Sequence, residues 1–576
     1  MRYVAAGHTV GISLVAADGI GDYAHDYEVQ IMADPATPPE GFRRDIGVIG
    51  LLYASLGGII GSGWLLGPRN AAMQAGPLSI FSWIFGGVAI LLLALVYAEL
   101  ATMFPRSGAV VHFPRFSHGS FLARIWSWVL FLGYVVIAPV EVVAVMSYAN
   151  SIPQVHHYLP PLVSAVNHQV TVVGLGVCVI LLVIFTAINL VGIRWAMRLS
   201  NAAGWWKLAI PTLTVILLLM NAHHANNLKI AKADWQHDFR GIFTSLATAG
   251  VIFSYLGFRQ AVELAGESNN PKRNIPIAVI GSVLIGLVLY VFLQLAFLLA
   301  VNPTQLHQYG WAGLTKIADF KTKTGPFAAL AEGLGLTWLA WLLYADAIVS
   351  PSGTGFIYTT TSARVIGAMG ESRILPPALA KLNRAGVPWM ASILSLLVGI
   401  CFLLPFPSWH RLVGYISSIM ALSYGIGPIV LLALRKSMPE PAHQRSFRLP
   451  WAPVLGPICF VISNLVIYWS GLHGNTLFFG IIGGMLAIFL LYRWIFDRPG
   501  FYSLPWKNTW WVPPYFGGLW LLDFVGSRGM VGGKGYLPFP WDVGAVAIFS
   551  LVVMYVALKA AIPLEEMQAY VETQEV

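Results

Sequence analysis

The sequence predicts an all-α integral membrane protein with about 14 transmembrane helices, two of them interrupted. Of the 576 residues, 57% are hydrophobic and only 10% are charged, whereas a soluble globular protein has about 25% charged residues. The mean hydropathy is +0.70, and apolar runs long enough to cross about 30 Å of hydrocarbon recur along nearly the whole chain. Glycines inside the first and sixth runs indicate helices that are broken within the membrane.

The expected transmembrane segments follow one another with polar connections between them. Each is apolar over roughly the length that a membrane-spanning helix needs. In chain order they cover 46–70, 78–103, 121–150, 170–192, 201–222, 240–265, 275–301, 326–358, 388–405, 411–434, 452–471 and 476–495, followed by 508–526 and 541–561.

The basic residues indicate how the chain is oriented. The formal net charge is +9, but no basic patch with interleaved aromatic residues suggests nucleic-acid binding. Most lysines and arginines instead fall in segments that are cytosolic when the N-terminus is placed in the cytosol, as the positive-inside rule requires. We therefore expect a multi-pass protein of the inner or plasma membrane, in contact with the lipid bilayer, with both termini cytosolic and no nucleic-acid partner.

Two segments interrupt the helical pattern, 57–63 in the first span and 253–258 in the sixth. Each glycine weakens a helix by about 1 kcal/mol, and a lipid-facing helix cannot leave backbone groups unpaired. Either segment alone is also explained by close packing of helices through small residues. Together, at corresponding places in two halves of the chain, they are typical of the binding site of a secondary transporter.

The spacing of the two breaks predicts two repeats of five helices each. An odd number of helices per repeat forces opposite orientations in the membrane, so the repeats are inverted. The expected parts of the chain are a cytosolic tail 1–42, a first repeat 43–222, an inverted second repeat 236–437, helices 11 and 12 in 447–496, two extra helices in 505–562 and an acidic cytosolic tail 563–576.

A broken helix exposes backbone groups that can bind a zwitterion. The second half-helix begins at the break, where free N–H groups and a partial positive charge suit a carboxylate. Carbonyl groups freed at the other break can accept hydrogen bonds from an ammonium group, with Phe258 helping to shape the pocket. The expected substrate-binding residues are Ile60, Gly61, Ser62 and Gly63 in the first break and Phe253, Ser254, Tyr255 and Gly257 in the second.

Several motifs resemble those of the amino acid–polyamine–organocation transporter family. Segments 61–68 and 97–108 are similar to its first-helix motif and its second-helix exit. Segments 257–276 and 362–388 are similar to its sixth-helix exit and its eighth-to-ninth loop. The resemblance covers roughly 43–495 and implies a LeuT-type fold of five-plus-five inverted repeats with alternating access.

Two further features resemble one branch of that family. The segment 138–144, the segment 537–542 and the two extra C-terminal spans look like the aspartate:proton symporter branch. This narrower resemblance implies that an acidic amino acid moves together with a proton.

Ionisable side chains inside membrane spans are candidates for function. Lys207 lies in the fifth span, and burial disfavours the charged form of a lysine; the alternative is a side chain that reaches cytosolic water. In the family that this chain resembles, proton-coupled members carry a lysine at this position. It stands where the sodium ion sits in sodium-coupled relatives. Glu141 and Asp346 are the other candidates for proton coupling. Each could instead be a structural partner of a neighbouring helix, and Asp346 could pair with Lys207.

Two arginines are candidates for recognising a side-chain carboxylate or for gating. Arg259 directly follows the second break, and its planar fork matches a carboxylate; alternatively it pairs with Glu263 one turn away. Some relatives that move cationic amino acids have an acidic residue at the position of Arg259. Arg69, on the outer half of the first span, could attract anions or anchor at the interface.

The remaining reactive residues suggest no other chemistry. Cys178, Cys401 and Cys459 fall in apolar spans and read as small buried hydrophobic residues. Glu99, Glu263 and Glu267 lie near cytosolic helix ends and are expected to pair with arginines such as Arg106 or Arg273. The loop histidines have no metal-ligand spacing; they are His156, His157, His223 and His224.

The sequence thus predicts a proton-coupled symporter of acidic amino acids, aspartate or glutamate. It needs no metal and no cofactor other than the proton as coupling ion, and it is not an enzyme, since no nucleophile–base pair lies at membrane depth. Three alternatives stay open: an amino acid exchanger, an importer of neutral or cationic amino acids or polyamines, and a sensor that binds an amino acid without moving it. Hydroxyl groups at 350–354 leave a sodium site possible. The oligomeric state is not determined.

Overall fold

The computed structural model places most of the chain. It describes residues 4–5, 8–9, 44–106, 108–152, 155, 160–164, 169–191, 193–222, 224–230, 235–317, 320, 325–372, 374–404, 408–438, 445–496, 498, 504–563 and 565–567, without the side chains of 193–203 and 235–238. Most of both predicted tails, and His156, His157 and His223, lie outside these residues.

The described part of the chain is helical apart from two strands of two residues each, β1 (Val4–Ala5) and β2 (His8–Thr9). The first half contains α1 (Val48–Ile59), α2 (Ser62–Ala75), α3 (Ser79–Met103), α4 (Ala109–Val135), α5 (Ile137–Ala149), α7 (Val172–Val191), α8 (Ile193–Asn221), α9 (Trp235–Thr248), α10 (Val251–Tyr255), α11 (Arg259–Glu263) and α12 (Pro271–Ala300).

The second half continues with long helices and short connecting ones. These are α13 (Pro303–Tyr309), α15 (Pro326–Gly333), α16 (Thr337–Glu371), α17 (Trp389–Leu403), α18 (Trp409–Ser437), α19 (Ala452–Ser470), α20 (Leu472–Phe496), α22 (Val512–Val525), α23 (Arg528–Val531) and α24 (Trp541–Lys559). Short 3₁₀ turns lie at Gly76–Leu78, Ala225–Lys229, Ala265–Glu267, Trp311–Lys316, Pro377–Ala380 and Trp506–Asn508.

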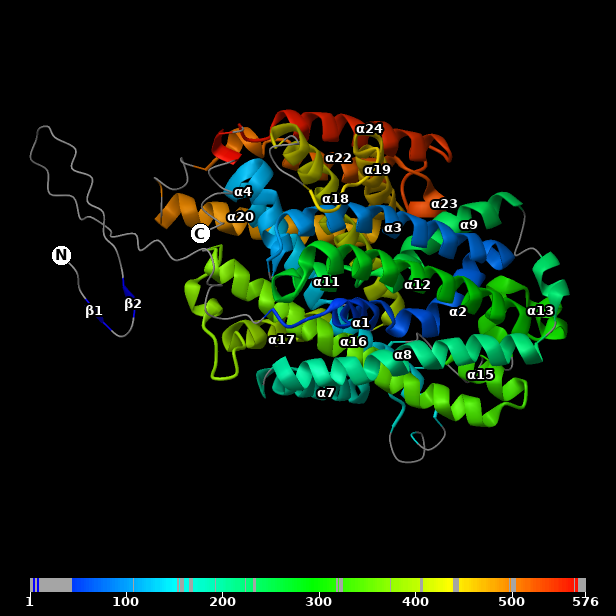
Figure 1. The fold of residues 1–576 in the computed structure, drawn as a ribbon. Helices are drawn as coiled ribbons and strands as arrows, with labels where there is room; N and C mark the ends of the chain where they lie inside the picture. The colour runs from blue at the N-terminus through cyan, green and yellow to red at the C-terminus, as the bar shows by residue number, and fades with distance from the viewer. Residues whose placement is uncertain are drawn as a thin grey trace, which may run out of the picture.

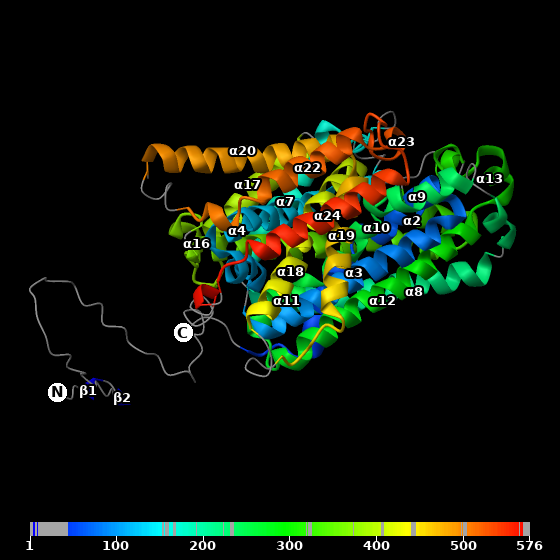
Figure 2. The same cartoon turned by 90° about the horizontal axis from the view of Figure 1, so that it is seen from above.

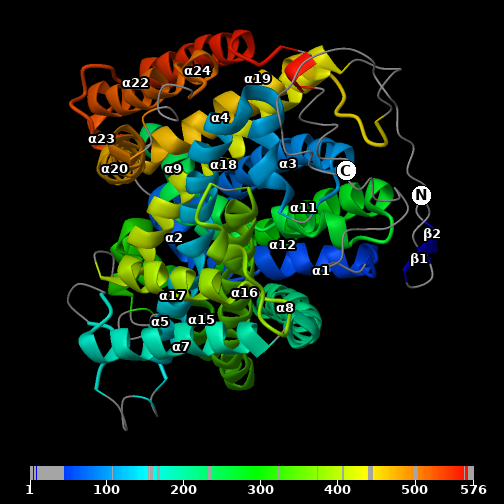
Figure 3. The ribbon, with the colours of Figure 1, turned by 90° about the vertical axis from the view of Figure 1, so that its left-hand side faces the viewer.

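The long helices form a bundle around α1, α3, α12, α16 and α18. The helix α3 packs on α12, α16 on α5, and α18 on both α4 and α19. The helices α22 and α24 lie along one edge of the molecule, with α7 and α8 along the other (Figure 1, Figure 3). Seen from above, α20 runs beside α22 at the periphery (Figure 2). Most residues of α1, α2, α10 and α11 are buried.

Nine stretches of the described residues are long and apolar enough to cross a membrane, and two shorter apolar helices, α1 and α17, accompany them. The expected span 121–150 begins close to a kink in α4. This helix runs from Ala109, but it is divided at Gly119, where φ is 83°, so its second part begins next to residue 121. The expected span 326–358 is wrong as one helix. The chain turns between α15 and α16, where Gly335 has φ 77°, and α16 extends further than expected.

The last two expected spans differ in length. The segment 541–561 contains α24, which is long enough to cross a membrane. The segment 508–526 contains α22, which has 14 residues and begins at Val512, directly before the Pro513–Pro514 pair. Since proline is tolerated in the first turn of a helix, the pair marks the beginning of this helix and shortens it.

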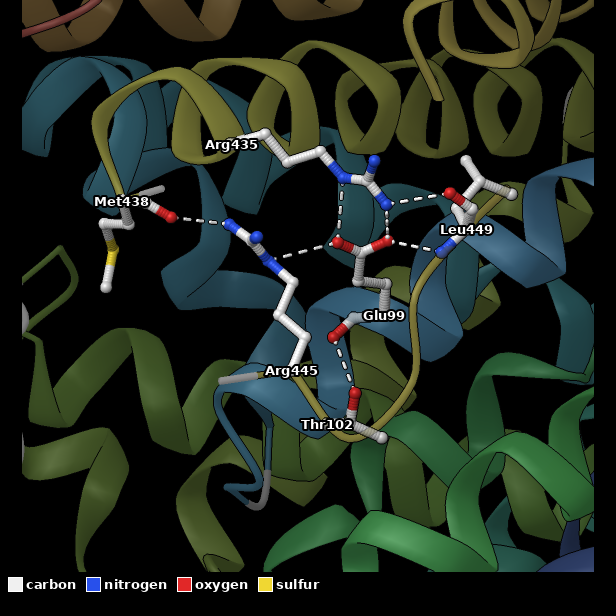
Figure 4. A network of polar contacts seen from close by, with 6 residues as sticks. All are labelled: Glu99, Thr102, Arg435, Met438, Arg445 and Leu449. Atoms are coloured by element: carbon white, nitrogen blue, oxygen red, sulfur yellow. Dashed lines mark hydrogen bonds and ion pairs between the residues drawn. The ribbon is translucent and has the colours of Figure 1, made fainter. Parts of the chain in front are cut away.

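Charged residues at one end of the bundle join distant segments (Figure 4). Glu99, at the end of α3, accepts two hydrogen bonds from Arg435 at 2.9 and 2.5 Å and one from the backbone N–H of Leu449. Arg445 pairs with the same carboxylate at 3.2 Å. The expected pairing of Glu99 with arginines is therefore confirmed, and the arginines that reach it come from α18 and the segment after it.

Two glycines let α1 and the turn that precedes α11 touch through their backbones. A Cβ atom on Gly257 would lie 2.4 Å from the carbonyl carbon of Gly58, and Gly257 has φ 126°, a conformation that other residues rarely adopt. The converse contact is also tight, since a Cβ on Gly58 would lie 3.1 Å from the Cα of Gly257. The crossing therefore requires glycine at 257 for two independent reasons.

We predict that Gly257→Ala destabilises the protein strongly. The left-handed backbone alone costs about 1–3 kcal/mol in a residue other than glycine, and the added methyl group overlaps α1. Thermal unfolding in detergent should show a lower midpoint. Gly484→Ala is the control, since a Cβ at that position meets no atom within 4 Å. Equal melting of the two variants would contradict the backbone contact.

Candidate functional site

Two non-helical residues separate α1 from α2. Ile60 has φ −87° and ψ 90°, and Gly61 has φ −128° and ψ −138°. At this point α1 ends with carbonyl groups that lack an intrahelical partner, and α2 begins with free N–H groups. The end of α1 therefore attracts a cation and the start of α2 an anion.

Lys207 of α8 places its ammonium group at the end of α1. The Nζ atom donates to the carbonyl of Gly57 at 2.7 Å and to the hydroxyl of Thr354 at 2.6 Å. The Thr354 hydroxyl in turn lies 2.9 Å from the carbonyl of Gly57 and 3.2 Å from that of Ile60. Lys207 is 1% exposed, so its ammonium group does not reach water in this structure.

Glu141 of α5 places its carboxylate at the start of α2. Its Oε2 atom accepts a hydrogen bond from the backbone N–H of Ser62 at 2.9 Å. The Oε1 atom is buried and has no hydrogen-bond partner among the described residues, although Lys207 is close enough to interact electrostatically. The side chain thus occupies the position at which the sequence suggested a substrate carboxylate.

Gly61 brings these groups together. A Cβ atom on Gly61 would lie 2.6 Å from Oε1 of Glu141 and 2.8 Å from the hydroxyl of Thr354. Both groups therefore face the same point of the backbone, and Lys207 is bonded to one of them. Only a residue without a side chain fits between them.

The second interruption lies directly against the first. The helix α10 ends at Tyr255, and α11 begins at Arg259 after the strained Gly257. A Cβ on Gly63 would lie 2.1 Å from the hydroxyl of Ser254. The hydroxyl of Tyr290 donates toward the carbonyls of Ile59 at 2.9 Å and Ser254 at 3.1 Å, which joins the two chain breaks.

The side chains of the aromatic residues predicted at the second break lie in different directions. Phe253 lies edge-on to Trp409, 6.0 Å between ring centres, and Trp409 donates to the hydroxyl of Ser62 at 2.8 Å. In contrast, the hydroxyl of Tyr255 is bonded to the carbonyl of Trp83 at 2.9 Å. Phe258 packs on Tyr97 and Tyr424, so of the three only Phe253 adjoins the start of α2.

Asp346 of α16 is buried but does not bond to Lys207. Its Oδ1 atom accepts a hydrogen bond from the indole of Trp206 at 2.8 Å, and Oδ2 has no hydrogen-bond partner among the described residues. The suggested pairing of Asp346 with Lys207 is therefore indirect, through Trp206, the residue that precedes Lys207. Arg69 of α2 is partly buried, and its Nε atom has no hydrogen-bond partner in the described structure.

Arg259 is enclosed by aromatic rings. Its guanidinium carbon lies 4.0 Å from the ring centre of Tyr424, 5.2 Å from that of Tyr134 and 5.5 Å from that of Tyr97. One nitrogen donates to the hydroxyl of Ser423 at 3.0 Å. Such cation–π contacts stabilise a desolvated cation.

The suggested ion pair of Arg259 with Glu263 is not among the described ion pairs. Glu263 instead accepts a hydrogen bond from Tyr134 at 2.9 Å. Glu267 pairs with Arg364 at 2.9 Å, so its expected pairing with an arginine is confirmed, with Arg364 as the partner. The acidic groups at this end are held by residues of α4 and α16.

Sequence reasoning missed Trp409 and Tyr290, which hold the start of α2 and the end of α1. No local signal marks them, since aromatic residues are abundant in every span. Among the described residues, no three histidine, cysteine or acidic side chains come together as a metal site. Cys178 and Cys459 are buried as expected, whereas Cys401 is exposed on α17.

Comparison with known proteins places this arrangement in context. The family model described as "Amino acid permease" matches residues 46–519. The glutamate/serine transporter AimA of Bacillus subtilis (strain 168) is 36% identical over 522 residues, which are 90% of this chain and 94% of that protein. The aspartate-proton symporter of the same organism is 33% identical over 527 residues, 91% of this chain and 97% of the symporter.

A more distant relative has a different named substrate. The branched-chain amino acid permease BcaP of Bacillus subtilis (strain 168) is 26% identical over 458 residues, which are 76% of this chain and 91% of the permease. The similar proteins are thus membrane transporters, not enzymes.

We predict that Lys207→Met lowers the stability of the protein. Methionine replaces the apolar stem as far as Cε but leaves the carbonyl of Gly57 without its ammonium donor, and a hydrogen bond to a charged group contributes about 1.5–3 kcal/mol. Thermal unfolding in detergent measures the loss. Lys381→Met, at an exposed position, is the matched control. A Lys207→Met protein as stable as the control would argue against the capping role.

Proposed function

The chain belongs to the amino acid permease family, and we propose that it is a proton-coupled symporter of acidic amino acids. The observation that carries the proposal is the pair of charges at the α1–α2 break, the Lys207 ammonium at one end and the Glu141 carboxylate at the other. The printed names of two relatives, a glutamate/serine transporter and an aspartate-proton symporter, support the same substrate class.

We further propose that the fold is a LeuT-type five-plus-five inverted repeat that works by alternating access. In this proposal α1 and α2 are the halves of broken helix 1, and α10 and α11 are parts of broken helix 6. The repeats occupy 43–222 and 236–437, and about 14 helices cross the membrane, with both termini cytosolic. The non-helical residues at both places support the assignment.

The proposed substrate site lies between the two breaks. Backbone N–H groups of 61–63 bind the α-carboxylate, and carbonyl groups near 253–257 bind the ammonium group. Phe253 and Trp409 form one wall. Arg259, and with it Arg69, supplies the positive charge that favours a side-chain carboxylate; the Nε atom of Arg259 has no hydrogen-bond partner among the described residues.

The position of Glu141 suggests how a proton is coupled to the substrate. The substrate carboxylate and the Glu141 carboxylate compete for the same N–H of Ser62, and two carboxylates cannot share it without repulsion. When Oε1 of Glu141 takes up a proton, the side chain becomes neutral and yields the N–H of Ser62 to the substrate. Proton binding and substrate binding then favour each other, as linkage requires.

Lys207 and Asp346 assist in this proposal. The ammonium group occupies the place beside Thr354 that a sodium ion would need, and a sodium ion next to it would be repelled. Lys207 therefore takes the part of the coupling cation and exchanges its proton with Glu141 during the cycle. Asp346, bonded to Trp206 beside Lys207, receives the proton on the exit path.

A simple exchanger is the second candidate function. The open alternatives also include transport of neutral or cationic amino acids or polyamines, and sensing without transport. A branched-chain permease among the relatives keeps neutral substrates possible for this family. Transport in proteoliposomes separates these cases, since only a symporter accumulates substrate when the vesicles contain none.

We predict that Glu141→Gln abolishes accumulation of labelled aspartate driven by an inward proton gradient without sodium. Glutamine imitates the protonated acid, so the substrate still binds and exchange against internal aspartate continues. Uptake into empty and preloaded proteoliposomes distinguishes the two activities. Glu566→Gln, on an exposed residue, should behave as the parent. Gradient-driven accumulation by Glu141→Gln would refute the coupling role.

We predict that Arg259→Gln weakens uptake of aspartate and glutamate at least tenfold more than uptake of serine. A tenfold difference corresponds to about 1.4 kcal/mol, the range of one charge-assisted hydrogen bond. Competition by unlabelled amino acids measures the ratio. Arg259→Lys is the paired variant, which keeps the charge. An equal loss for acidic and neutral substrates would assign Arg259 a structural role within its three tyrosines.

A further inference from the structure

A second cluster of buried polar side chains lies far from the chain breaks, between α18, α19, α20 and the C-terminal helices α22 and α24. The family model ends at residue 519, so both carboxylates of the cluster, Asp523 and Asp542, lie beyond the part that defines the family. Both are 1% exposed. Nothing in the proposed transport cycle uses them.

Asp542 is fully supplied with hydrogen-bond donors. Its Oδ2 atom accepts from the hydroxyl of Tyr468 at 2.7 Å and from the hydroxyl of Ser527, and its Oδ1 atom accepts from the backbone N–H of Val543 at 2.8 Å. The residue also lies in the first turn of α24, where a negative charge is favoured. These contacts satisfy both oxygens of the carboxyl group.

Asp523 is in the opposite situation. Its Oδ2 atom accepts one hydrogen bond, from the amide of Asn475 at 2.7 Å, and its Oδ1 atom is buried with no hydrogen-bond partner among the described residues. In the described structure no lysine, arginine or histidine donates to it. A buried carboxylate with a single donor is costly, so the site is incomplete while Asp523 is ionised.

A proton on Asp523 would complete this site better than a bound metal ion would. Hard divalent cations take about six oxygen ligands, whereas the described residues offer no cluster of three acidic, histidine or cysteine side chains here. The titratable groups that face this cluster are Tyr468 from α19 and Asp542 from α24. From α20 and α18 the facing groups, Asn475 and Ser418, do not titrate, and the nearby Arg528 and Lys534 are exposed.

Asn475 connects Asp523 to the transport core. Its amide nitrogen donates to Asp523 and to the carbonyl of Ile467, and its amide oxygen accepts from the hydroxyl of Ser418 on α18. Ser423, five residues further along α18, accepts the hydrogen bond of Arg259. Along an α-helix, five residues correspond to a rise of about 7.5 Å and a rotation of about 140° beyond one full turn. Ser418 and Ser423 therefore lie on different faces of α18, and this helix separates the two clusters.

We propose that Asp523 is a reversible proton-binding site in the C-terminal helices, connected through Asn475 and Ser418 to α18. A proton from water forms the O–H bond on Oδ1, and the side chain changes from a charge of minus one to neutral. The change alters the hydrogen bond that Asn475 donates to Asp523 and, through Asn475, the hydrogen bond that it accepts from Ser418. This site is separate from Glu141 and Lys207 and does not depend on the proposed substrate.

Infrared difference spectroscopy of the full-length protein in liposomes tests the site without any transport assay. A step to lower pH should produce the carbonyl-stretch band of a protonated buried carboxylic acid, recognised by its shift in D₂O. Asp523→Asn, which keeps the acceptor for Asn475, should remove this band. Glu141→Gln, Asp346→Asn and Asp542→Asn should leave it in place, and Ser418→Ala should shift its frequency.

Two further observations keep the test decisive. Asp523→Glu retains a carboxyl group and should show a displaced band, which covers the case in which Asp523→Asn does not fold. Because Glu141 and Asp346 can give bands of their own, the decisive comparison is made in a protein that carries both Glu141→Gln and Asp346→Asn. A band that survives there after the further change Asp523→Asn would overturn the proposal, as would its loss after Asp542→Asn instead. So would the absence of any titrating band from a protein carrying both Glu141→Gln and Asp346→Asn.

Discussion

The interruption between α1 and α2 is the constraint on which the described structure depends. Two helix ends meet inside the bundle, and each would leave polar backbone groups unpaired in a medium without water. Lys207 and Thr354 satisfy the carbonyl side, and Glu141 satisfies the N–H side. Because the neutralising charges come from α8 and α5, those helices must pack against the break. The enclosing bundle follows from this need, and so does the requirement for glycine at 61.

In the proposed function, the same arrangement lets substrate binding and proton coupling share one place. A helix end recognises charge through its backbone, so it accepts any carboxylate of suitable position. A side-chain carboxylate there acts as an internal competitor whose strength depends on its protonation state. In the proposed cycle this competition replaces a separate signal between a proton site and a substrate site. The Arg259 cluster then adds selectivity without taking part in the competition.

The sequence predicted the helical class, the family and most spans, because hydropathy and glycine placement are local properties. Lys207 and Glu141 were also identifiable, since a charge inside an apolar run is conspicuous. Their contacts were not, because they depend on how α5 and α8 cross α1. The three tyrosines around Arg259 come from α3, α4 and α18, and no spacing along the chain joins them. Likewise the ends of α4 and α16 depend on single glycines with positive φ.

The crossing of α1 and α11 at Gly58 and Gly257 has a mechanical consequence. Where side chains separate two helices, small rearrangements of rotamers let one helix slide over the other. Here main chain rests on main chain, and no rotamer can absorb a displacement. The two interrupted helices are therefore held together by direct backbone contact. In the proposed transport cycle, we therefore expect the two segments to move together at this crossing.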